Sequence, residues 1–164
     1  MRVRKEMDVF KLILYQEQEE WLKQNNRERV NSLKDPENDN LPTLKFQLPV
    51  PYEGPKDDEG KNLHYTPEHF FIAAVAGCFF TTFSVVSSNS KFKYKTLKIE
   101  SEGYIGTSTG VKMMEKIKNH VYLTIEPPER EKKALKVLEL TEKACPLGNS
   151  VKSKLEYEFH VIIE

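Results

Sequence analysis

The chain has 164 residues, of which 38% are hydrophobic, 10% aromatic and 30% charged, a composition typical of one soluble globular domain. Its 25 basic and 25 acidic residues cancel to a net charge of zero, which argues against nucleic-acid binding through a large basic surface. A domain of this length can bury a core without disulfides, and only Cys78 and Cys145 occur. The first residues contain no small-residue cleavage site, so we expect a cytoplasmic protein.

The N-terminal third offers two predicted strands. Residues 9–15 (VFKLILY) form a short run rich in aliphatic and aromatic side chains, which predicts the first strand. The polar stretch that follows predicts connections without a defined element. Residues 44–50 alternate apolar side chains with Lys45, Gln47 and Pro49, which predicts a second strand with one face toward a core. Residues 51–61 then form a loop.

A long helix is the clearest predicted element. Thr66 offers an N-cap oxygen, Pro67 fits the first helical position and Glu68 complements the positive helix end. The uninterrupted apolar run of residues 70–80 is too short to span a membrane, and the helix should end near residues 87–90. A helix that is apolar all round must be covered all round, so we expect two chains to share the covering in a symmetric dimer. Burial between one sheet and the second helix is the alternative.

The C-terminal part adds strands and a second helix. Residues 91–104 and 111–125, joined by GTSTG, predict a hairpin. Pro127 and Pro128 precede a helix with one apolar stripe, formed by Ala134, Val137, Leu138, Thr141 and Cys145. Strict alternation from residue 155 to residue 163 predicts a last strand. This order of elements indicates an α+β fold rather than regular βαβ alternation.

Several kinds of site have no support in the sequence. The stretch GYIGTSTG at residues 103–110 lacks both the dinucleotide spacing and the P-loop lysine, and G-x-S-x-G is absent. His64 and His69 do not form an H-E-x-x-H pattern, and His120 and His160 fall in strand patterns typical of surface or structural histidines. We therefore predict no metal and no bound cofactor.

The two thiols are the remaining candidates for chemistry. A free cysteine is most often a small buried hydrophobe. Cys78 falls in mid-helix, where a buried thiol stays protonated and inert unless a cation lies close by. Cys145 falls at a helix C-terminus, where the partial negative charge disfavours a thiolate. Cys78 is therefore the better candidate nucleophile.

Two segments resemble a known family. T-P-E-H-F-F-I-A-A-V-A-G-C-F at residues 66–79 and K-A-C-P-L-G-N-S at residues 143–150 resemble the two signature segments of the OsmC/Ohr family, the osmotically inducible and organic hydroperoxide resistance proteins. The resemblance covers about residues 63–164. It implies one OsmC-like domain over residues 1–164, with strands and polar connections in residues 1–62 and both cysteines in residues 63–164.

The resemblance also implies a fold and an assembly. Family members have an α+β fold in which antiparallel sheets wrap around a long central apolar helix. They form an intertwined homodimer with two active sites at the subunit interface. We expect this chain to do the same, without nucleic-acid or membrane partners.

The activity that the resemblance implies is thiol-dependent reduction of organic hydroperoxides by an external dithiol. Cys78 then corresponds to the peroxidatic cysteine, Cys145 to the resolving one and Glu68 to the acidic active-site residue. Ten residues of helix separate Glu68 from Cys78, about 15 Å, so Glu68 should serve the partner chain's site. The family's thiolate-stabilising arginine lies in the N-terminal hairpin, where this chain offers Arg29 or Arg27.

Two features keep a second interpretation open. Neither arginine stands in a clear motif, and Gly148 replaces a serine that usually precedes the equivalent of Asn149. Four phenylalanines could line a cleft for a bulky peroxide or simply form core, namely Phe70, Phe71, Phe79 and Phe80. The alternative function is therefore a catalytically weak protein that binds a hydrophobic small molecule at the dimer interface.

Overall fold

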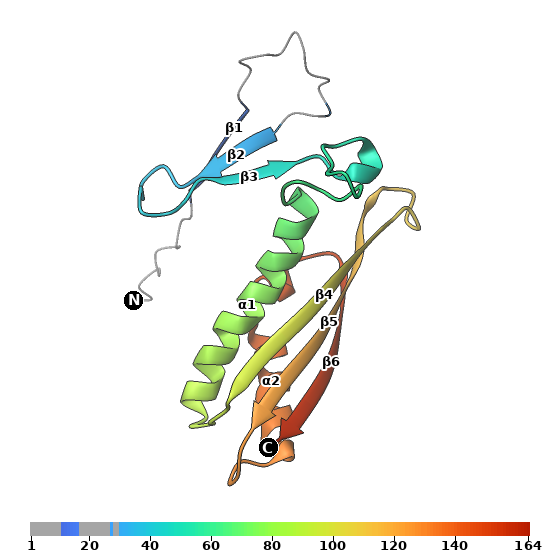
Figure 1. The fold of residues 1–164 in the computed structure, drawn as a ribbon. Coiled ribbons are helices and arrows are strands. Elements are labelled where there is room, and N and C mark those ends of the chain that lie inside the picture. The colour runs from blue at the N-terminus through green and yellow to red at the C-terminus, as the bar shows by residue number, and fades with distance from the viewer. Residues whose placement is uncertain (1–10, 17–26, 28–29) are drawn as a thin grey trace, which may run out of the picture. The chain divides into compact units, whose positions relative to one another are not determined.

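The computed structural model describes residues 11–16, 27 and 30–164. The chain divides into two compact units, Met1–Pro67 and Glu68–Glu164. This division falls close to the boundary at residue 62 that the sequence suggested between the polar N-terminal part and the cysteine-containing part. Figure 1 shows the first unit in blue to green and the second from green to red.

The first unit contains a three-stranded antiparallel sheet with the order β1-β2-β3. Its strands are β1 (Ile13–Gln16), β2 (Val30–Lys34) and β3 (Leu44–Gln47). The predicted first strand is confirmed at its C-terminal end, while residues 9 and 10 lie outside the described residues. Strand β2 corrects the expectation that the polar stretch holds no element. Leu33 of β2 pairs with Leu14 on one side and Leu44 on the other, so neighbouring strands stabilise a segment of weak propensity.

The predicted second strand ends earlier than expected. Residues Val50–Tyr52 form a short 3-10 helix, because Pro49 has no N–H to continue the ladder. The buried Gln47 side chain stabilises the following loop: its amide donates to the Pro55 carbonyl at 2.6 Å, and its Oε1 accepts from the His64 N–H at 2.8 Å. Only glycine fits at position 54, since a Cβ there would lie 1.6 Å from the Leu48 carbonyl oxygen.

The second unit contains a mixed three-stranded sheet with the order β4-β5-β6. The predicted hairpin is confirmed as β4 (Thr96–Gly106) and β5 (Met113–Ile125). The last strand, β6 (Lys154–Ile163), pairs parallel to β5, and helix α2 (Glu131–Ala144) connects the two. The expectation of purely antiparallel sheets is therefore wrong, because β5, α2 and β6 form one βαβ unit.

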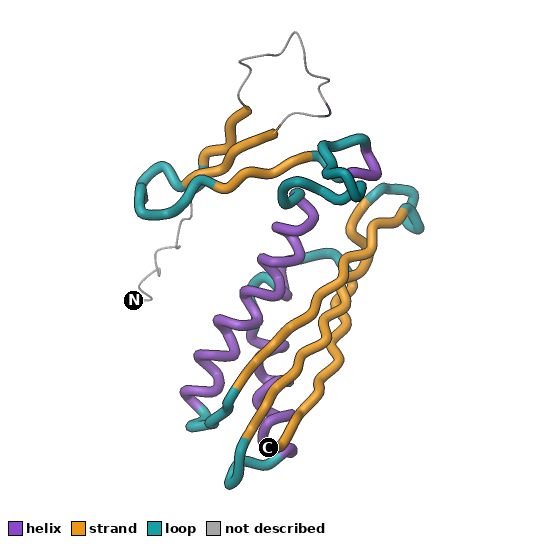
Figure 2. Tube along the Cα trace, in the orientation of Figure 1, coloured by secondary structure: helices purple, strands orange, loops and turns teal. Residues whose placement is uncertain are grey.

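Both helices of the second unit pack on one face of this sheet, as Figure 2 shows. Helix α1 spans Pro67–Asn89, which confirms the predicted start and end. The core joins side chains of both helices and of the sheet, chiefly Phe79, Phe83, Val121, Leu123, Ile125, Ala134, Val137 and Leu138. The opposite sheet face, hereafter the charged face, carries Lys98, Glu100, Lys118, His120, Tyr122, Glu156, Glu158 and His160, alternating with the core residues.

Within the second unit, helix α1 is covered on one side only. Its buried residues recur every four positions, at Val75, Phe79, Phe83 and Ser87. The opposite stripe is exposed although it is mostly apolar or small, at Ala73, Ala74, Gly77, Phe80, Thr81, Ser84, Val85 and Ser88. The apolar run of residues 70–80 was expected to be too short for a membrane span, but α1 as a whole is long and apolar enough to cross one, as core helices of other proteins also are. The second unit by itself therefore leaves an apolar helical stripe without cover.

Candidate active site

The two cysteine side chains lie next to each other although the sequence separates them widely. Cys78 is on α1, partly exposed and adjacent to the buried Phe79. Cys145 directly follows α2 and is fully buried. The two thiols interact, and both remain free in this structure. That both cysteines act in one site stays a prediction; the structure shows that their thiols are neighbours.

Burial raises the pKa of the Cys145 thiol above its ordinary value of 9.0, and the neighbouring Cys78 adds to the rise. The N–H groups of Gly148 and Leu147 act in the opposite direction, because they donate hydrogen bonds to the Cys145 sulfur. The position of Cys145 at a helix C-terminus predicted that its pKa is raised. In the structure, burial is the largest cause of this rise. Cys145 is thus a protonated thiol at neutral pH, with two backbone donors in place to stabilise the thiolate once it forms.

Tyr157 of β6 is a site neighbour that the sequence analysis did not identify. Burial raises the pKa of its phenol strongly, and the nearby Cys145, Glu142 and Cys78 contribute. Its ring stacks on Phe79 with centroids 5.2 Å apart. Alternation in β6 places Tyr157 on the core face, but no sequence signal indicates that the cysteines lie there too. A neutral phenol therefore borders both thiols.

The turn after Cys145 is held by its own side chains. The Asn149 amide donates to the Lys143 carbonyl at 3.1 Å, and the Ser150 hydroxyl donates to the Pro146 carbonyl at 2.7 Å. These bonds satisfy carbonyls at the end of α2 and fix the N–H groups that face the sulfur. A Cβ at Gly148 would lie 3.4 Å from the Cys145 sulfur, an ordinary contact, so the glycine is compatible with the turn but not required.

The raised pKa values of Cys145 and Tyr157 predict a loss of stability in alkaline solution. Each group keeps its proton to higher pH in the folded than in the unfolded chain, so unfolding releases protons once pH exceeds the ordinary values of 9.0 and 10.0. The free energy of unfolding should be insensitive to these groups below about pH 8 and fall toward about pH 10. Urea unfolding across this range measures the slope, and Tyr157→Phe or Cys145→Ser should make it shallower. An unchanged slope in both variants would contradict the assignment.

The predicted acidic residue and arginines remain predictions. Glu68 lies in the first turn of α1, and its Oε2 is buried without a hydrogen-bond partner among the described residues. Arg27 forms an ion pair with Glu53 within the first unit, and Arg29 lies outside the described residues. Residues 68–164 contain a single arginine, Arg130, which precedes α2 at the end opposite Cys145, about 20 Å away. Within the same chain, a guanidinium for Cys78 would therefore have to come from residues 1–67.

The four phenylalanines that could line a cleft divide between two roles. Phe79 is fully buried and packs on Tyr157 and Phe159, so it belongs to the core. Phe71 and Phe80 are 39% and 38% exposed, and Phe70 is half-buried. The exposed pair remains available to an apolar ligand or to a second chain.

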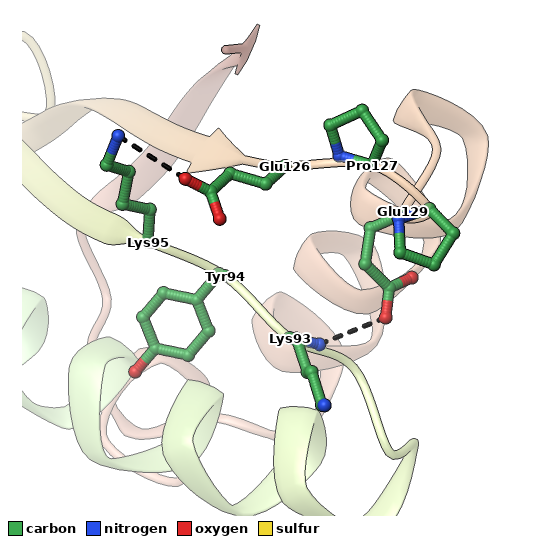
Figure 3. Close-up of a pocket in the computed structure, with 7 residues that line it drawn as sticks. Lys93, Tyr94, Lys95, Glu126, Pro127 and Glu129 are labelled. Carbon is green, nitrogen blue, oxygen red and sulfur yellow. Dashed lines mark hydrogen bonds and ion pairs between the residues drawn. The ribbon is translucent and has the colours of Figure 1, made fainter.

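A surface pocket lies at the other end of α2. It has a volume of about 370 Å³ and is lined by Lys93, Tyr94, Lys95, Glu126, Pro127, Pro128 and Glu129. Figure 3 shows two of its interactions: the Lys95 side chain contacts Glu126 at 3.4 Å, and the Lys93 backbone N–H donates to the Glu129 carboxylate at 3.1 Å. Tyr94 packs edge-on against Phe83, 5.0 Å away. Because this pocket contains no thiol, we place the candidate active site at the cysteines.

Solved structures with the same fold cover nearly the whole chain. An OsmC-like protein from Mycoplasma pneumoniae matches with a TM-score of 0.72 and 10% identity, over 94% of this chain and 98% of that one. An organic hydroperoxide resistance protein from Elizabethkingia anophelis matches with a TM-score of 0.65 and 17% identity, over 96% and 99%. The organic hydroperoxide resistance protein OhrB of Bacillus subtilis matches with a TM-score of 0.60 and 14% identity, over 93% and 98%.

These identities establish likeness of fold alone, and no curated protein matches the chain significantly. The family of the chain is shown instead by a comparison of its sequence with a family model. The family of OsmC-like proteins matches residues 59–160, a range that contains α1, the sheet of the second unit, α2 and both cysteines. The resemblance of the two cysteine segments is thereby confirmed, and the chain belongs to the OsmC-like protein family.

Proposed function

We propose that the protein is a cytoplasmic, thiol-dependent peroxidase that reduces organic hydroperoxides to alcohols through Cys78 and Cys145. The observation that carries the proposal is the adjacency of a partly exposed thiol on α1 and a buried thiol at the end of α2. Membership of the OsmC-like family and the hydroperoxide resistance proteins among its structural neighbours support it.

The chemistry assigns a different step to each sulfur. The Cys78 thiolate attacks the outer peroxide oxygen, the O–O bond breaks, and the departing alkoxide takes a proton to become the alcohol. Cys78 is left as a sulfenic acid. The Cys145 sulfur, stabilised as a thiolate by the Leu147 and Gly148 N–H groups, then attacks the Cys78 sulfur, and hydroxide leaves as water. An external dithiol reduces the resulting disulfide and restores both thiols.

Activation of Cys78 requires a cation from the N-terminal unit, and we propose a homodimer in which the partner contributes to the site. Arg29 or Arg27 is the candidate cation, and Glu68 the carboxylate that orients it. The buried, unpartnered Glu68 Oε2 supports this role, because a buried carboxylate oxygen needs a donor such as a guanidinium. Since Glu68 and Cys78 are about 15 Å apart along α1, the carboxylate would act on the partner's thiol.

Stoichiometric cumene hydroperoxide should convert the reduced protein to one intramolecular Cys78–Cys145 disulfide. The two thiols are neighbours that interact in the reduced protein, so disulfide formation should compete successfully with further oxidation. Peptide mass spectrometry under alkylating quench measures the product, and addition of a dithiol should return both free thiols. Persistent free thiols after exposure to one equivalent of peroxide would defeat the proposal.

A second candidate function is binding of a hydrophobic small molecule beside α1. The partly exposed ring of Phe80 favours it, because it leaves apolar surface on α1 two residues from Cys78. In that case a fluorescent hydrophobic probe should bind equally well to the wild-type protein and to Cys78→Ser, while peroxide leaves the wild-type thiols unchanged. Disulfide formation without probe binding would exclude this function.

A further inference from the structure

The charged face of the second unit carries a group of two histidines and a glutamate on adjacent strands. His120 of β5 pairs in register with Glu158 of β6, and His160 lies two residues further along β6. All three side chains project from the face opposite the core, so the group is separate from the cysteine site. From the sequence both histidines were expected to be surface or structural residues, since forty positions separate them along the chain.

The ligand atoms of this group already lie close to the spacing that a metal ion requires. His120 Nδ1 is 3.3 Å from Glu158 Oε2, His160 Nε2 is 3.5 Å from Glu158 Oε1, and the ligand atoms all lie within 4.8 Å of one another. In a tetrahedral Zn²⁺ site with bonds of about 2.1 Å, neighbouring ligand atoms stand about 3.4 Å apart. Each histidine nitrogen lies near that distance from one of the two Glu158 oxygens.

An unpartnered nitrogen is the second observation that points to a ligand. His160 Nε2 is buried from solvent and makes no hydrogen bond with any described residue, since its 3.5 Å contact with Glu158 fails the required geometry. The His160 ring is held in place by stacking on Tyr122 at 4.6 Å and by the His120 ring at 5.8 Å. The imidazole is held in place, and its buried nitrogen faces a carboxylate without a hydrogen bond. Coordination of a metal ion by this nitrogen would therefore be favourable.

Side chains of both charge signs surround the group, and they do not prevent a cation from binding. Lys118 Nζ lies 3.8 Å from Glu158 Oε2 and competes for that carboxylate, but its side chain is flexible and about one-third exposed. Glu100 pairs in register with His120 on the other side, but its carboxylate forms an ion pair with Lys98 at 2.5 Å. A divalent cation would thus meet two imidazoles and the Glu158 carboxylate, for which it would have to displace Lys118, while Glu100 stays paired with Lys98.

We propose that His120, Glu158 and His160 form a binding site for Zn²⁺ or a similar divalent transition ion, with water in the remaining position. Two imidazoles and one carboxylate are a known zinc ligand set, and such nitrogen and oxygen ligands also suit Cu²⁺ and Co²⁺. Coordination joins the edge strand β6 to the central strand β5. Because the ion binds the folded chain, it raises the stability of the second unit and the thermal midpoint.

The test uses the full-length Cys78→Ser/Cys145→Ser variant, so that thiolates cannot hold the metal. Titration with ZnCl₂ against a chromophoric chelator should show one Zn²⁺ per chain and a raised thermal midpoint that excess chelator reverses. Co²⁺ should give visible d–d bands without thiolate charge-transfer bands. Removing one ligand, by His160→Ala or the isosteric Glu158→Gln, should weaken Zn²⁺ binding at least about tenfold.

Two matched controls keep the result specific. Glu156→Gln changes a carboxylate on the same face and strand, and His64→Ala removes a histidine of the first unit, so both should bind Zn²⁺ like the parent. Circular dichroism checks that each variant is folded, and Glu158→Gln preserves side-chain shape should His160→Ala fail to fold. Absence of Zn²⁺ binding by the parent, or equal affinity in the ligand variants and controls, would overturn the proposal.

Discussion

Replacing Cys78 by serine should lower dithiol-dependent turnover of cumene or tert-butyl hydroperoxide at least about a thousandfold, because no other described thiol is accessible. Cys145 is fully buried and its pKa is raised, so it cannot take over the attack on the peroxide. Peroxide consumption with a saturating dithiol measures the loss. Ser84→Ala, a hydroxyl change on the exposed side of the same helix, should leave turnover unchanged.

Cys145→Ser separates the two chemical steps. This variant retains the nucleophile, so it should consume one equivalent of hydroperoxide per chain and then accumulate a Cys78 sulfenic acid that dimedone traps. Slow repeated turnover is expected only if the dithiol reduces the sulfenic acid directly. Full turnover by Cys78→Ser, or loss of the first equivalent in Cys145→Ser, would assign the chemistry to other groups and favour the binding function.

Local signals in the sequence were enough to predict the helices and the hairpin. Thr66 and Pro67 mark the start of α1, the apolar stripe from Ala134 to Thr141 marks α2, and GTSTG marks the turn between β4 and β5. These features depend on residues a few positions apart, where propensity and periodicity are decisive. Strand β2 was missed because its stability comes from pairing with β1 and β3 rather than from its own polar sequence.

Contacts between distant segments were harder to predict. The parallel pairing of β5 with β6 decides that His120 meets Glu158 and that Tyr157 approaches the cysteines, and neither spacing nor composition encodes that choice. The adjacency of Cys78 and Cys145 was reached through the resemblance of their segments to a family. The source of the activating cation stays a prediction, because Arg29 lies outside the described residues and Arg27 pairs with Glu53.

A charge placed in the exposed stripe of α1 should strongly change the assembly and stability of the protein. Gly77 lies at the middle of this stripe, and a Cβ placed there meets no atom within 4 Å in the single chain. If the stripe faced water, Gly77→Glu would stabilise the chain by about 1 kcal/mol, because glycine is a poor helix former. If a second chain covers the stripe, as we propose for the homodimer, the same change buries an unpaired carboxylate at a cost of several kcal/mol.

We therefore expect Gly77→Glu to convert a dimeric protein into a monomer and to lower its thermal midpoint. Sedimentation velocity over a range of concentrations measures the assembly. Val111→Glu introduces the same charge at a side chain that is 65% exposed beyond the end of β4, and it should remain dimeric. A dimeric and stabilised Gly77→Glu variant would show that the second chain does not cover this stripe. Because Glu68 would then lack a route to the partner's Cys78, that outcome would also remove the proposed role of the carboxylate in activating the thiol.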